Sequence, residues 1–309
     1  MKILGTGSAL PEKVVTNDDL ARVMDTSDEW IRTRTGIQKR HIAVNETTTS
    51  MAVEAAKKAL EEAKISIDDL DLIIAATVSP DYIFPTLACE VQAAVGAKNA
   101  TAFDLGAGCS GFLFALATAD AYFKTGRYKN ALIIGAETLS KMMDWGDRST
   151  CVLFGDGAGA AVVSAQGEQL LSMVQGSDGS GGMALKCDNR PVNNLYHQMG
   201  AQQYSFTQME GSAVYKFAVR TVPHAISEAL EKAGVPVDDV KLFVLHQANL
   251  RIIESVAKRL RQPMEKFPTN LEECGNISAA SVPILLDKVR KDGMISKGDK
   301  IVMAGFGAG

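Results

Sequence analysis

The stretch ALEEAKISIDDLDLIIAAT at residues 59–77 recurs as ALEKAGVPVDDVKLFVLHQ at residues 229–247. Seven positions are identical without a gap, and each residue of the first copy lies 170 positions before its match. A second pair of segments, ALIIGAE at 131–137 and IVMAGFG at 301–307, has the same offset. Two matches at one offset indicate that the chain contains a duplicated unit.

Each copy shows the pattern of alternating helices and strands. Apolar residues at helical spacing predict helices at 48–63 and 218–233, and the branched runs LDLIIAATV and VKLFVLHQA are typical of strands buried on both faces. Two further apolar segments that end at glycine, 111–126 and 281–293, predict another helix in each copy. The alternation predicts an α/β fold with largely parallel sheets.

The duplication also predicts how the chain is divided. Residues 1–165 and 211–309 are expected to form two similar halves that pack as one pseudo-symmetric body. Residues 166–210 lie between them and are rich in Gly, Asn and Gln. Such a polar segment is expected to be a surface excursion that acts as a lid or wall.

Composition limits the classes of partner. A net charge of −4 over 309 residues argues against a nucleic-acid partner. The sequence has no run of 18 apolar residues and no signal-peptide pattern at its start, so we expect a cytoplasmic protein without a membrane partner. Five scattered cysteines without a CxxC pair are typical of free thiols rather than of disulfides or a metal site.

The segment DLGAGCSGFLFAL at residues 104–116 places one cysteine among glycines, directly before an apolar helical run. The backbone N–H groups and the dipole at a helix N-terminus favour a thiolate, and the glycines allow a sharp bend and a close ligand. Cys109 is therefore a candidate nucleophile, whose pKa is expected to be lowered.

The offset of 170 carries Cys109 to Ala279, within GNISAAS. Cys109 and Asn276 therefore lie in equivalent strand-to-helix turns of the two copies. His246 lies at the end of a predicted strand of the second copy, and ligands of such sheets gather at the carboxyl ends of strands. We expect a thiol, an imidazole and an amide to converge there.

Each of these residues also has a structural interpretation. Buried cysteines behave as small hydrophobic residues, a lone histidine at a strand end is usually structural, and asparagine after glycine is common in turns. The glycine-rich segment GDGAGAAVV at 155–163 matches neither the dinucleotide nor the phosphate-loop motif. It is interpreted as a tight turn before a strand.

Several motifs together resemble the thiolase superfamily, and within it the 3-oxoacyl-[acyl-carrier-protein] synthase III family. These motifs are GTGSALPEKVVTN (5–17), DTSDEWIRTRTGIQKRHI (25–42), AFDLGAGCSGF (102–112), FGDGAGAAV (154–162), HQANLRI (246–252), GNISAAS (275–281) and GFGAG (305–309). The resemblance spans essentially the whole chain. It implies a duplicated thiolase-like fold in a five-layer αβαβα arrangement, usually a homodimer.

The resemblance implies a Cys-His-Asn acyltransferase that needs no metal or organic cofactor. Cys109 would take an acyl group from acyl-coenzyme A and pass it to malonyl-acyl-carrier-protein, which loses carbon dioxide and becomes 3-oxoacyl-acyl-carrier-protein. His246 and Asn276 would donate hydrogen bonds to the enolate oxygen. Backbone N–H groups of Cys109 and of the turn at Gly307 and Ala308 would form the oxyanion hole of the condensation.

The resemblance also implies binding residues, position by position. Coenzyme A is expected to contact Thr26, Trp30, Arg34, Arg148, Gly211, Tyr215 and Asn249. The acyl pocket is expected to comprise Leu139, Met142, Phe306 and, from a dimer partner, Phe84. The acidic acyl carrier protein is expected to dock on a basic group formed by Lys216, Arg251, Lys258 and Arg259.

Some positions depart from the family pattern, and two alternative functions stay open. Ser212, Cys274 and Ile277 replace residue types that are commoner in the family near the channel and near Asn276. One alternative is a polyketide-type synthase with the same triad that uses only coenzyme A thioesters. The other is a non-enzymatic protein that binds acyl thioesters. The sequence also leaves open whether the primer is acetyl, branched or longer.

Overall fold

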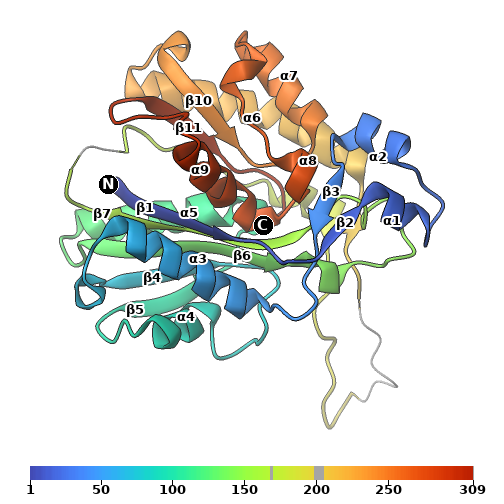
Figure 1. The fold of residues 1–309 in the computed structure, drawn as a ribbon, viewed down its shortest axis with the longest axis horizontal. Coiled ribbons are helices and arrows are strands. Elements are labelled where there is room, and N and C mark those ends of the chain that lie inside the picture. The colour runs from blue at the N-terminus through green and yellow to red at the C-terminus, as the bar shows by residue number, and fades with distance from the viewer. Residues whose placement is uncertain (168–169, 198–204, 309) are drawn as a thin grey trace.

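The computed structural model describes residues 1–167, 170–197 and 205–308 (Figure 1). The strands are β1 (Lys2–Ala9), β2 (Val14–Thr16), β3 (Lys39–His41), β4 (Leu72–Ala76), β5 (Thr101–Leu105), β6 (Asn130–Thr138), β7 (Asp156–Ser164), β8 (Leu185–Lys186), β9 (Gln208–Met209), β10 (Val240–Leu245) and β11 (Lys300–Ala304). The α-helices are α1 (Asn17–Ala21), α2 (Asp28–Thr35), α3 (Thr48–Ala63), α4 (Leu87–Val95), α5 (Gly111–Lys124), α6 (Gly211–Ala233), α7 (Leu250–Leu260), α8 (Leu271–Cys274) and α9 (Ser281–Lys291). Short 3-10 helices are η1 (Ile67–Asp69), η2 (Gly108–Ser110), η3 (Leu139–Met142), η4 (Gly179–Ala184), η5 (Val237–Asp239), η6 (Met264–Lys266) and η7 (Ser278–Ala280). None of the helices within the described ranges is long and apolar enough to cross a membrane.

A five-stranded sheet in the order β1-β7-β6-β4-β5 lies at the centre, and it is mixed rather than largely parallel. β4 is parallel to β5 and β6, whereas β7 is antiparallel to both β6 and β1. β10 and β11 form a separate parallel pair. The prediction of largely parallel sheets was wrong at the β7-β1 edge. Residues 139–155 between β6 and β7 contain only η3, and a connection without a crossover helix favours antiparallel neighbours.

Helices cover both faces of this sheet (Figure 1). α3 and α4 pack on one face through a core that includes Met51 and Leu87, and α5 and α9 pack on the other through Phe112 and Leu285. The same core continues from α5 and α9 to Val244 of β10. α6 and α7 cover the far side of the β10-β11 pair. Both faces of each sheet are thus removed from water, which is the main source of stability in such layered folds.

Glycines allow two elements to pack directly on the central strands. A Cβ added at Gly159 of β7 would lie 2.7 Å from the backbone nitrogen of Ile284 in α9, and one at Gly135 of β6 would overlap the carbonyl of Ala279 in η7. The segment 155–163 therefore lies almost wholly in strand β7, and its interpretation as a tight turn was wrong. Its glycines serve close packing rather than a bend.

The offset of 170 residues extends to the helix ends. α3 and α6 end at Ala63 and Ala233, and α5 and α9 begin at Gly111 and Ser281. The short helices η2 and η7, which precede α5 and α9, match at the same offset. Local structure therefore repeats together with the sequence in these segments.

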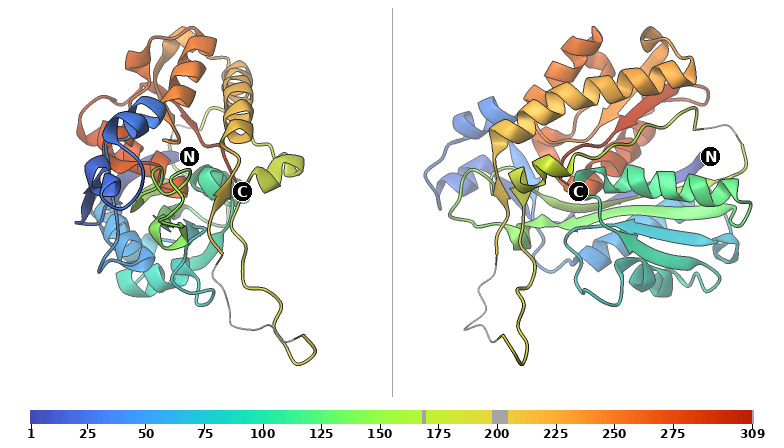
Figure 2. Two further views of the ribbon diagram at one scale, coloured as in Figure 1. Left: turned by 90° about the vertical axis from the view of Figure 1, so that its right-hand side faces the viewer. Right: turned by 180° about the vertical axis from the view of Figure 1, so that it is seen from behind.

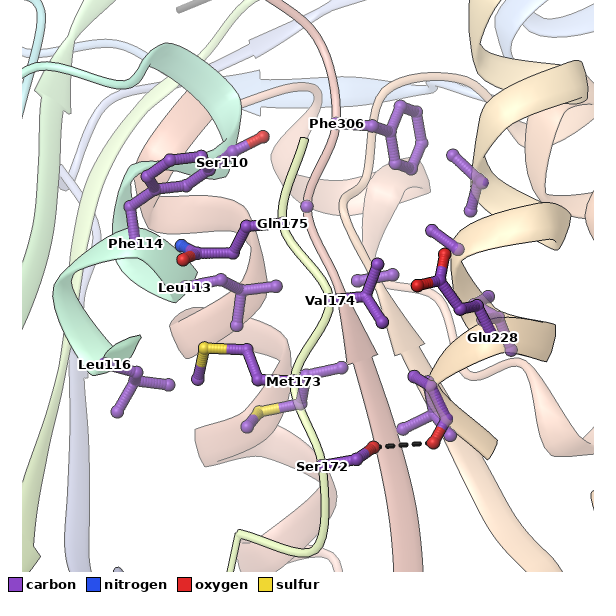
Figure 3. A pocket seen from close by; sticks show the side chains of 18 of the residues that line it. Ser110, Leu113, Phe114, Leu116, Ser172, Met173, Val174, Gln175, Glu228 and Phe306 are labelled. Carbon is purple, nitrogen blue, oxygen red and sulfur yellow. Dashed lines mark hydrogen bonds between the residues drawn. The ribbon is translucent and has the colours of Figure 1, made fainter. Parts of the chain in front are cut away.

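The described part of residues 166–210 includes η4 and the β8-β9 pair, and it extends well beyond the body of the molecule (Figure 2). One portion is held against that body. Residues 172–175 run between α5 and α6, and the Ser172 hydroxyl donates a hydrogen bond to the Ala229 carbonyl at 2.6 Å (Figure 3).

Candidate active site

Cys109 lies in η2, directly before α5, and its side chain is buried with 7% exposed. Gly108 has a φ of +46°, which allows the chain to turn into the helix. Burial raises the pKa of the Cys109 thiol to about 11. The expected lowering of this pKa was therefore wrong for the resting protein, because desolvation of the thiolate outweighs the effect of the helix N-terminus. A proton acceptor is needed before this thiol can react.

His246 follows β10, and its backbone N–H donates to the Ala304 carbonyl at 2.8 Å, which extends the pairing with β11. Its ring meets the Phe306 ring edge-on at 5.3 Å between centroids. The side chain is almost completely buried, and burial lowers its pKa to about 3. His246 is therefore a neutral imidazole at physiological pH, with an Nδ1 atom that has no hydrogen-bond partner.

Asn276 is held by its backbone on both sides. Its N–H donates to the Leu153 carbonyl at 2.9 Å, and its carbonyl accepts from the Gly155 N–H at 3.0 Å. Its side-chain Oδ1 accepts from the Ser278 N–H at 2.9 Å. Because the oxygen is occupied, the amide orientation is set and the Nδ2 donor can be offered to a ligand.

The turn after β11 and the short helix η7 both contact the side chain of Cys109. A Cβ at Gly307 would lie 3.0 Å from the Cys109 sulfur, so the backbone after Phe306 passes directly beside the thiol. From the other side, the Ser278 side chain interacts with the Cys109 sulfur while its N–H holds Asn276. Phe306 contacts His246, and Ser278 contacts Asn276, so each candidate donor is linked to the surroundings of Cys109 through a different element.

The expected oxyanion hole is only partly present. The backbone of Gly307 and Ala308 lies next to Cys109. However, the Cys109 N–H donates to the Ala308 carbonyl at 3.2 Å. This donor is therefore occupied in the resting protein, because the turn presents a carbonyl to it. The turn has to shift before the Cys109 N–H can stabilise an oxyanion.

Four of the residues expected to bind coenzyme A lie close together. The Arg34 and Arg148 guanidinium groups lie 4.7 and 5.1 Å from the centre of the Trp30 ring. Arg148 also bonds to Asp25, through the backbone carbonyl and, at 3.1 Å, through the carboxylate. The buried Thr26 hydroxyl has no hydrogen-bond partner. A flat aromatic ring with two cations close to it suits an adenine ring with nearby phosphates.

The other three such residues have different surroundings. Gly211 begins α6, and Tyr215 on the same helix is 39% exposed. Asn249 caps the N-terminus of α7 by accepting from the Arg251 N–H at 2.9 Å, and its Nδ2 donates to the Arg34 carbonyl at 3.1 Å. Asn249 therefore has a structural role that its motif did not reveal: it ties α7 to the end of α2.

The four residues expected to line the acyl pocket have different surroundings. Leu139 on η3 packs in a cluster with Ile31 and Phe154, and Met142 borders that cluster. Phe306 lies against His246. Phe84 is 83% exposed on the loop before α4. Within a single chain it is not part of a pocket around Cys109.

The basic residues expected to bind the carrier protein are all exposed. Lys216 lies on α6, whereas Lys258 and Arg259 lie in the last turn of α7. Arg251 begins the same helix, but its Nη2 donates to the Thr33 carbonyl at 2.8 Å. Its guanidinium is therefore partly committed to holding α2, which the charge pattern did not predict.

A cavity of about 2090 Å³ lies between α5, α6 and β11, with residues 172–175 running through it (Figure 3). It reaches the site at Ser110 of η2 and at Phe306, Gly307 and Ala308, but it is not lined by Cys109, His246 or Asn276. Its walls are mostly apolar, including Leu113, Leu116 and Val174. The cavity borders the surroundings of Cys109 without being lined by Cys109 itself.

Two buried polar residues near Cys109 were missed by the sequence analysis: Glu137 at the end of β6, and Ser278. Glu137 has no exposed surface, and burial raises its pKa to about 7. Ser278 has a φ of +43° and matches Gly108 at the offset of 170. That match was a usable signal, because a serine that replaces a turn glycine at positive φ requires a reason.

Together, this fold, the buried thiol of Cys109, the neutral imidazole of His246 and the oriented amide of Asn276 define an acyltransferase with a thiolase-like fold. Within the described residues, no group of three or more His, Cys, Asp or Glu side chains can hold a metal ion.

Comparisons with known proteins identify the family. The model of 3-Oxoacyl-[acyl-carrier-protein (ACP)] synthase III matches residues 103–179, and the model of its C-terminal part matches residues 230–309. Beta-ketoacyl-[acyl-carrier-protein] synthase III of Clostridium novyi is 49% identical over 310 residues, which cover 100% of this chain and 96% of that protein. The chain therefore belongs to the 3-oxoacyl-[acyl-carrier-protein] synthase III family, the initiating condensing enzymes of type II fatty acid synthesis.

Solved structures agree with this assignment. The crystal structure of 3-oxoacyl-[acyl-carrier-protein] synthase III from Aquifex aeolicus matches with a TM-score of 0.91 at 48% identity, over 98% of this chain and 95% of that chain. The priming beta-ketosynthase of the R1128 polyketide biosynthetic pathway matches with a TM-score of 0.92 at 37% identity, over 99% and 92%.

Proposed function

We propose that this protein transfers an acyl group from acyl-coenzyme A to Cys109 and then condenses it with malonyl-acyl-carrier-protein. The observation that supports the proposal is the contact of Gly307 and Ser278 with the Cys109 side chain, because Gly307 follows Phe306, which packs on His246, and Ser278 holds the Asn276 side chain. In the first half-reaction the sulfur of Cys109 attacks the acyl carbon, and coenzyme A leaves.

In the second half-reaction, malonyl-acyl-carrier-protein loses carbon dioxide, and the resulting enolate attacks the Cys109 thioester. His246 and Asn276 donate hydrogen bonds to the enolate oxygen. Two neutral donors suit this role, because they stabilise the developing charge in a buried site without transferring a proton. The neutral state of His246 and the fixed orientation of Asn276 support this assignment. No metal or organic cofactor takes part.

Coenzyme A is assigned to the group around Trp30, with Thr26, Arg34 and Arg148, and its pantetheine arm passes Gly211, Tyr215 and Asn249 toward Cys109. The acyl chain lies against Leu139, Met142 and Phe306. Phe84 closes that pocket in a homodimer, from the partner subunit. The exposure of Phe84 and its neighbours Tyr82 and Ile83 supports an apolar contact between two copies.

The same repeat also supports a more detailed proposal for the fold. We infer two duplicated halves, residues 1–165 and 211–309, that form a five-layer αβαβα thiolase-like body with residues 166–210 between them. The recurrence of helix ends at one offset supports the duplication. The successive packing of α3 and α4, the main sheet, α5 and α9, β10 and β11, and α6 and α7 supports the five layers.

A second candidate is the priming step of a polyketide synthase, which the 37% identity to the R1128 priming ketosynthase favours. A non-enzymatic thioester-binding protein would use the same cleft without a covalent step. A primer scan separates these functions. The purified protein is incubated with acetyl-, branched and medium-chain acyl-coenzyme A, its intact mass is measured, and then malonyl-acyl-carrier-protein or malonyl-coenzyme A is added.

The expected result is an acyl adduct on Cys109 that is consumed by malonyl-acyl-carrier-protein. Consumption by malonyl-coenzyme A alone would support the coenzyme-A-only alternative. The absence of any adduct on Cys109 with every primer would contradict the proposed function.

A further inference from the structure

Glu137 is a buried carboxyl group that the reaction described above does not use. It lies at the end of β6, and its side chain has no exposed surface. Burying a carboxylate is unfavourable unless a cation or several hydrogen bonds compensate for the lost water. The chain keeps Glu137 in the layer that also holds Cys109, so the reason for this carboxyl group needs explanation.

The hydrogen bonds of Glu137 come from the segment that follows β4. The Ser79 hydroxyl donates to Oε2 at 2.5 Å, the Thr77 hydroxyl donates to the same oxygen at 3.2 Å, and the Val78 N–H lies 3.1 Å from it. These donors hold the carboxyl group in one orientation, and they are neutral. They fix the group without neutralising its charge.

The other side of Glu137 faces η7. On a strand, residues two apart share a face, so Glu137 lies on the same face of β6 as Gly135. A Cβ at Gly135 would overlap the Ala279 carbonyl, which means that η7 rests directly on this face. The Ser278 side chain interacts with both the Glu137 carboxyl group and the Cys109 sulfur. Ser278 therefore lies between a buried acid and a buried thiol.

Among the ionisable groups on the elements around Glu137, Cys109 interacts with it directly, whereas Asp156 and Lys141 have other partners. Cys109 on η2 interacts with it electrostatically, and each raises the cost of ionising the other. Asp156 on β7 is taken up by hydrogen bonds from Ser140 and from the Ala43 N–H. Lys141 pairs with Asp81, and it reaches this network only through the Thr48 hydroxyl from α3.

We propose that Ser278 and Glu137 form a proton-accepting chain for Cys109. As the Cys109 sulfur attacks the acyl carbon, its S–H proton passes to the Ser278 oxygen, and the Ser278 O–H proton passes to the Glu137 carboxylate. The S–H electron pair forms the new S–C bond, and the bond between the acyl carbon and coenzyme A breaks. Coenzyme A leaves as a thiolate and takes a proton from water.

The chain runs in reverse when the condensation is complete. Attack by the enolate expels the Cys109 thiolate, which recovers its proton from Ser278, while Glu137 returns its proton to Ser278. Glu137 thus stores one proton for the lifetime of the acyl-enzyme and ends each cycle as it began. An acid with a pKa near neutrality is suited to both directions, which the raised pKa of Glu137 supports. This proposal rests on the proposed function, because it takes Cys109 as the nucleophile.

The test compares E137Q, S278A and the double variant with the unchanged protein. The rate of Cys109 acylation by acyl-coenzyme A is measured by intact mass between pH 5.5 and 9.5, together with the rate of Cys109 alkylation by iodoacetamide. In the unchanged protein both rates should rise with pH through about 7. E137Q and S278A should each lose this rise and react roughly 100-fold more slowly at pH 7, within the range for loss of a general base.

The double variant should be no slower than either single variant, because both residues serve one chain. D156N is the matched control: it neutralises a buried carboxyl group on the neighbouring strand that does not face Cys109, and it should keep the pH profile. Folding is checked by thermal unfolding at pH 8. Because burial raises the Glu137 pKa, its ionisation opposes folding above about pH 7, so E137Q should be no less stable there.

One outcome overturns the proposal directly. If Glu137 acts on Cys109 only by repulsion of the thiolate, E137Q makes Cys109 faster at pH 7, not slower. An unchanged pH profile in E137Q or S278A also overturns it while leaving Cys109 as the nucleophile. If the unchanged protein forms no adduct on Cys109 at any pH, the proposed function itself fails.

Discussion

The two turns at η2 and η7 have the same backbone design and different chemistry. Each begins with a residue at positive φ, Gly108 at +46° and Ser278 at +43°. The next residue is Cys109 in one turn and Ala279 in the other. A shared backbone therefore places a candidate nucleophile in the first turn and leaves the second turn free for another role.

The two turns are also alike in that a glycine packs against each of them. Gly135 of β6 lies against the Ala279 carbonyl, and Gly305, 170 residues later, lies against Cys109 and Ser110. Each turn is thus packed by a glycine of the other copy: η7 by Gly135 of β6, and η2 by Gly305 after β11. At these two turns, the difference lies in a few side chains, not in how the backbone is arranged.

Ser278 shows what this difference costs. A residue with a Cβ at positive φ is destabilised by about 1–2 kcal/mol relative to the right-handed region, whereas glycine is not. The strained serine is retained where its N–H holds the Asn276 side chain and its hydroxyl meets Cys109 and Glu137. The second turn thus sacrifices local stability for contacts with the site of the first.

The largest effect on acyl transfer is expected when the cysteine of the first turn is removed or moved to the second turn. Cys109→Ala should reduce acyl transfer by roughly 10⁴-fold or more, as for the loss of other enzymatic nucleophiles. Adding Ala279→Cys should not restore it, because residue 279 lies against β6 and its backbone carbonyl faces Gly135. Intact mass after incubation with acyl-coenzyme A measures both variants. An adduct that persists on Cys89 or Cys274 in the first variant would contradict the assignment.

The next largest effect concerns the position two residues before each turn. Asn276→Ala, like His246→Ala, should slow malonyl decarboxylation by about 3 kcal/mol of barrier, the cost of one oxyanion donor, while some acyl transfer to Cys109 remains. Gly106 occupies the position equivalent to Asn276, and a Cβ there meets nothing within 4 Å, so Gly106→Ala is the matched control. Release of carbon dioxide and acylation of Cys109 are measured separately. Parent-rate decarboxylation in Asn276→Ala would remove that residue from the site.

A smaller effect is expected on stability. Gly135→Ala should destabilise the fold by about 2–3 kcal/mol, because its new methyl group would overlap a backbone carbonyl that cannot move alone. Gly305→Ala should cost less, since its nearest neighbours are 3.0 and 3.1 Å from the added Cβ. Urea unfolding of both variants measures the difference. A larger loss for Gly305→Ala would mean that the two contacts are not equivalent.

The smallest effect is expected on binding of the acyl carrier protein, because the two corresponding helices differ in their basic residues. The helix that follows β10 ends in Lys258 and Arg259, whereas α4, the helix that follows β4, has no basic residue in its last turn. Lys258→Glu with Arg259→Glu should weaken use of malonyl-acyl-carrier-protein roughly tenfold at low salt, with a smaller loss at high salt. Acylation by acyl-coenzyme A should not change.

Arg251 is left out of that double variant, because its bond to the Thr33 carbonyl makes a charge reversal structurally disruptive. Rates with both substrates at two salt concentrations provide the measurement. Equal losses on the two substrates would place Lys258 and Arg259 in a shared coenzyme A contact or in folding, not in carrier-protein docking.

The repeat, the helices that carry it and the position of the candidate nucleophile could all be predicted from sequence. Helix periodicity and glycine stops are local properties, so the ends of α3 and α6 follow from their own residues. The direction of β7 and the use of its glycines could not be predicted, because both depend on which elements pack against that strand. Asn249 and Arg251 were assigned to ligands from their motif, but their bonds to α2 come from a segment more than 200 residues away.

The sequence by itself determined which positions correspond: a constant offset places the turns of Cys109 and Asn276 at corresponding points of two similar segments. Only the tertiary structure decided their protonation states. Burial keeps Cys109 a thiol, His246 a neutral imidazole and Glu137 an acid that titrates near pH 7. The cost of ionising each group depends on how completely distant segments exclude water from it, and no local pattern in the chain records that.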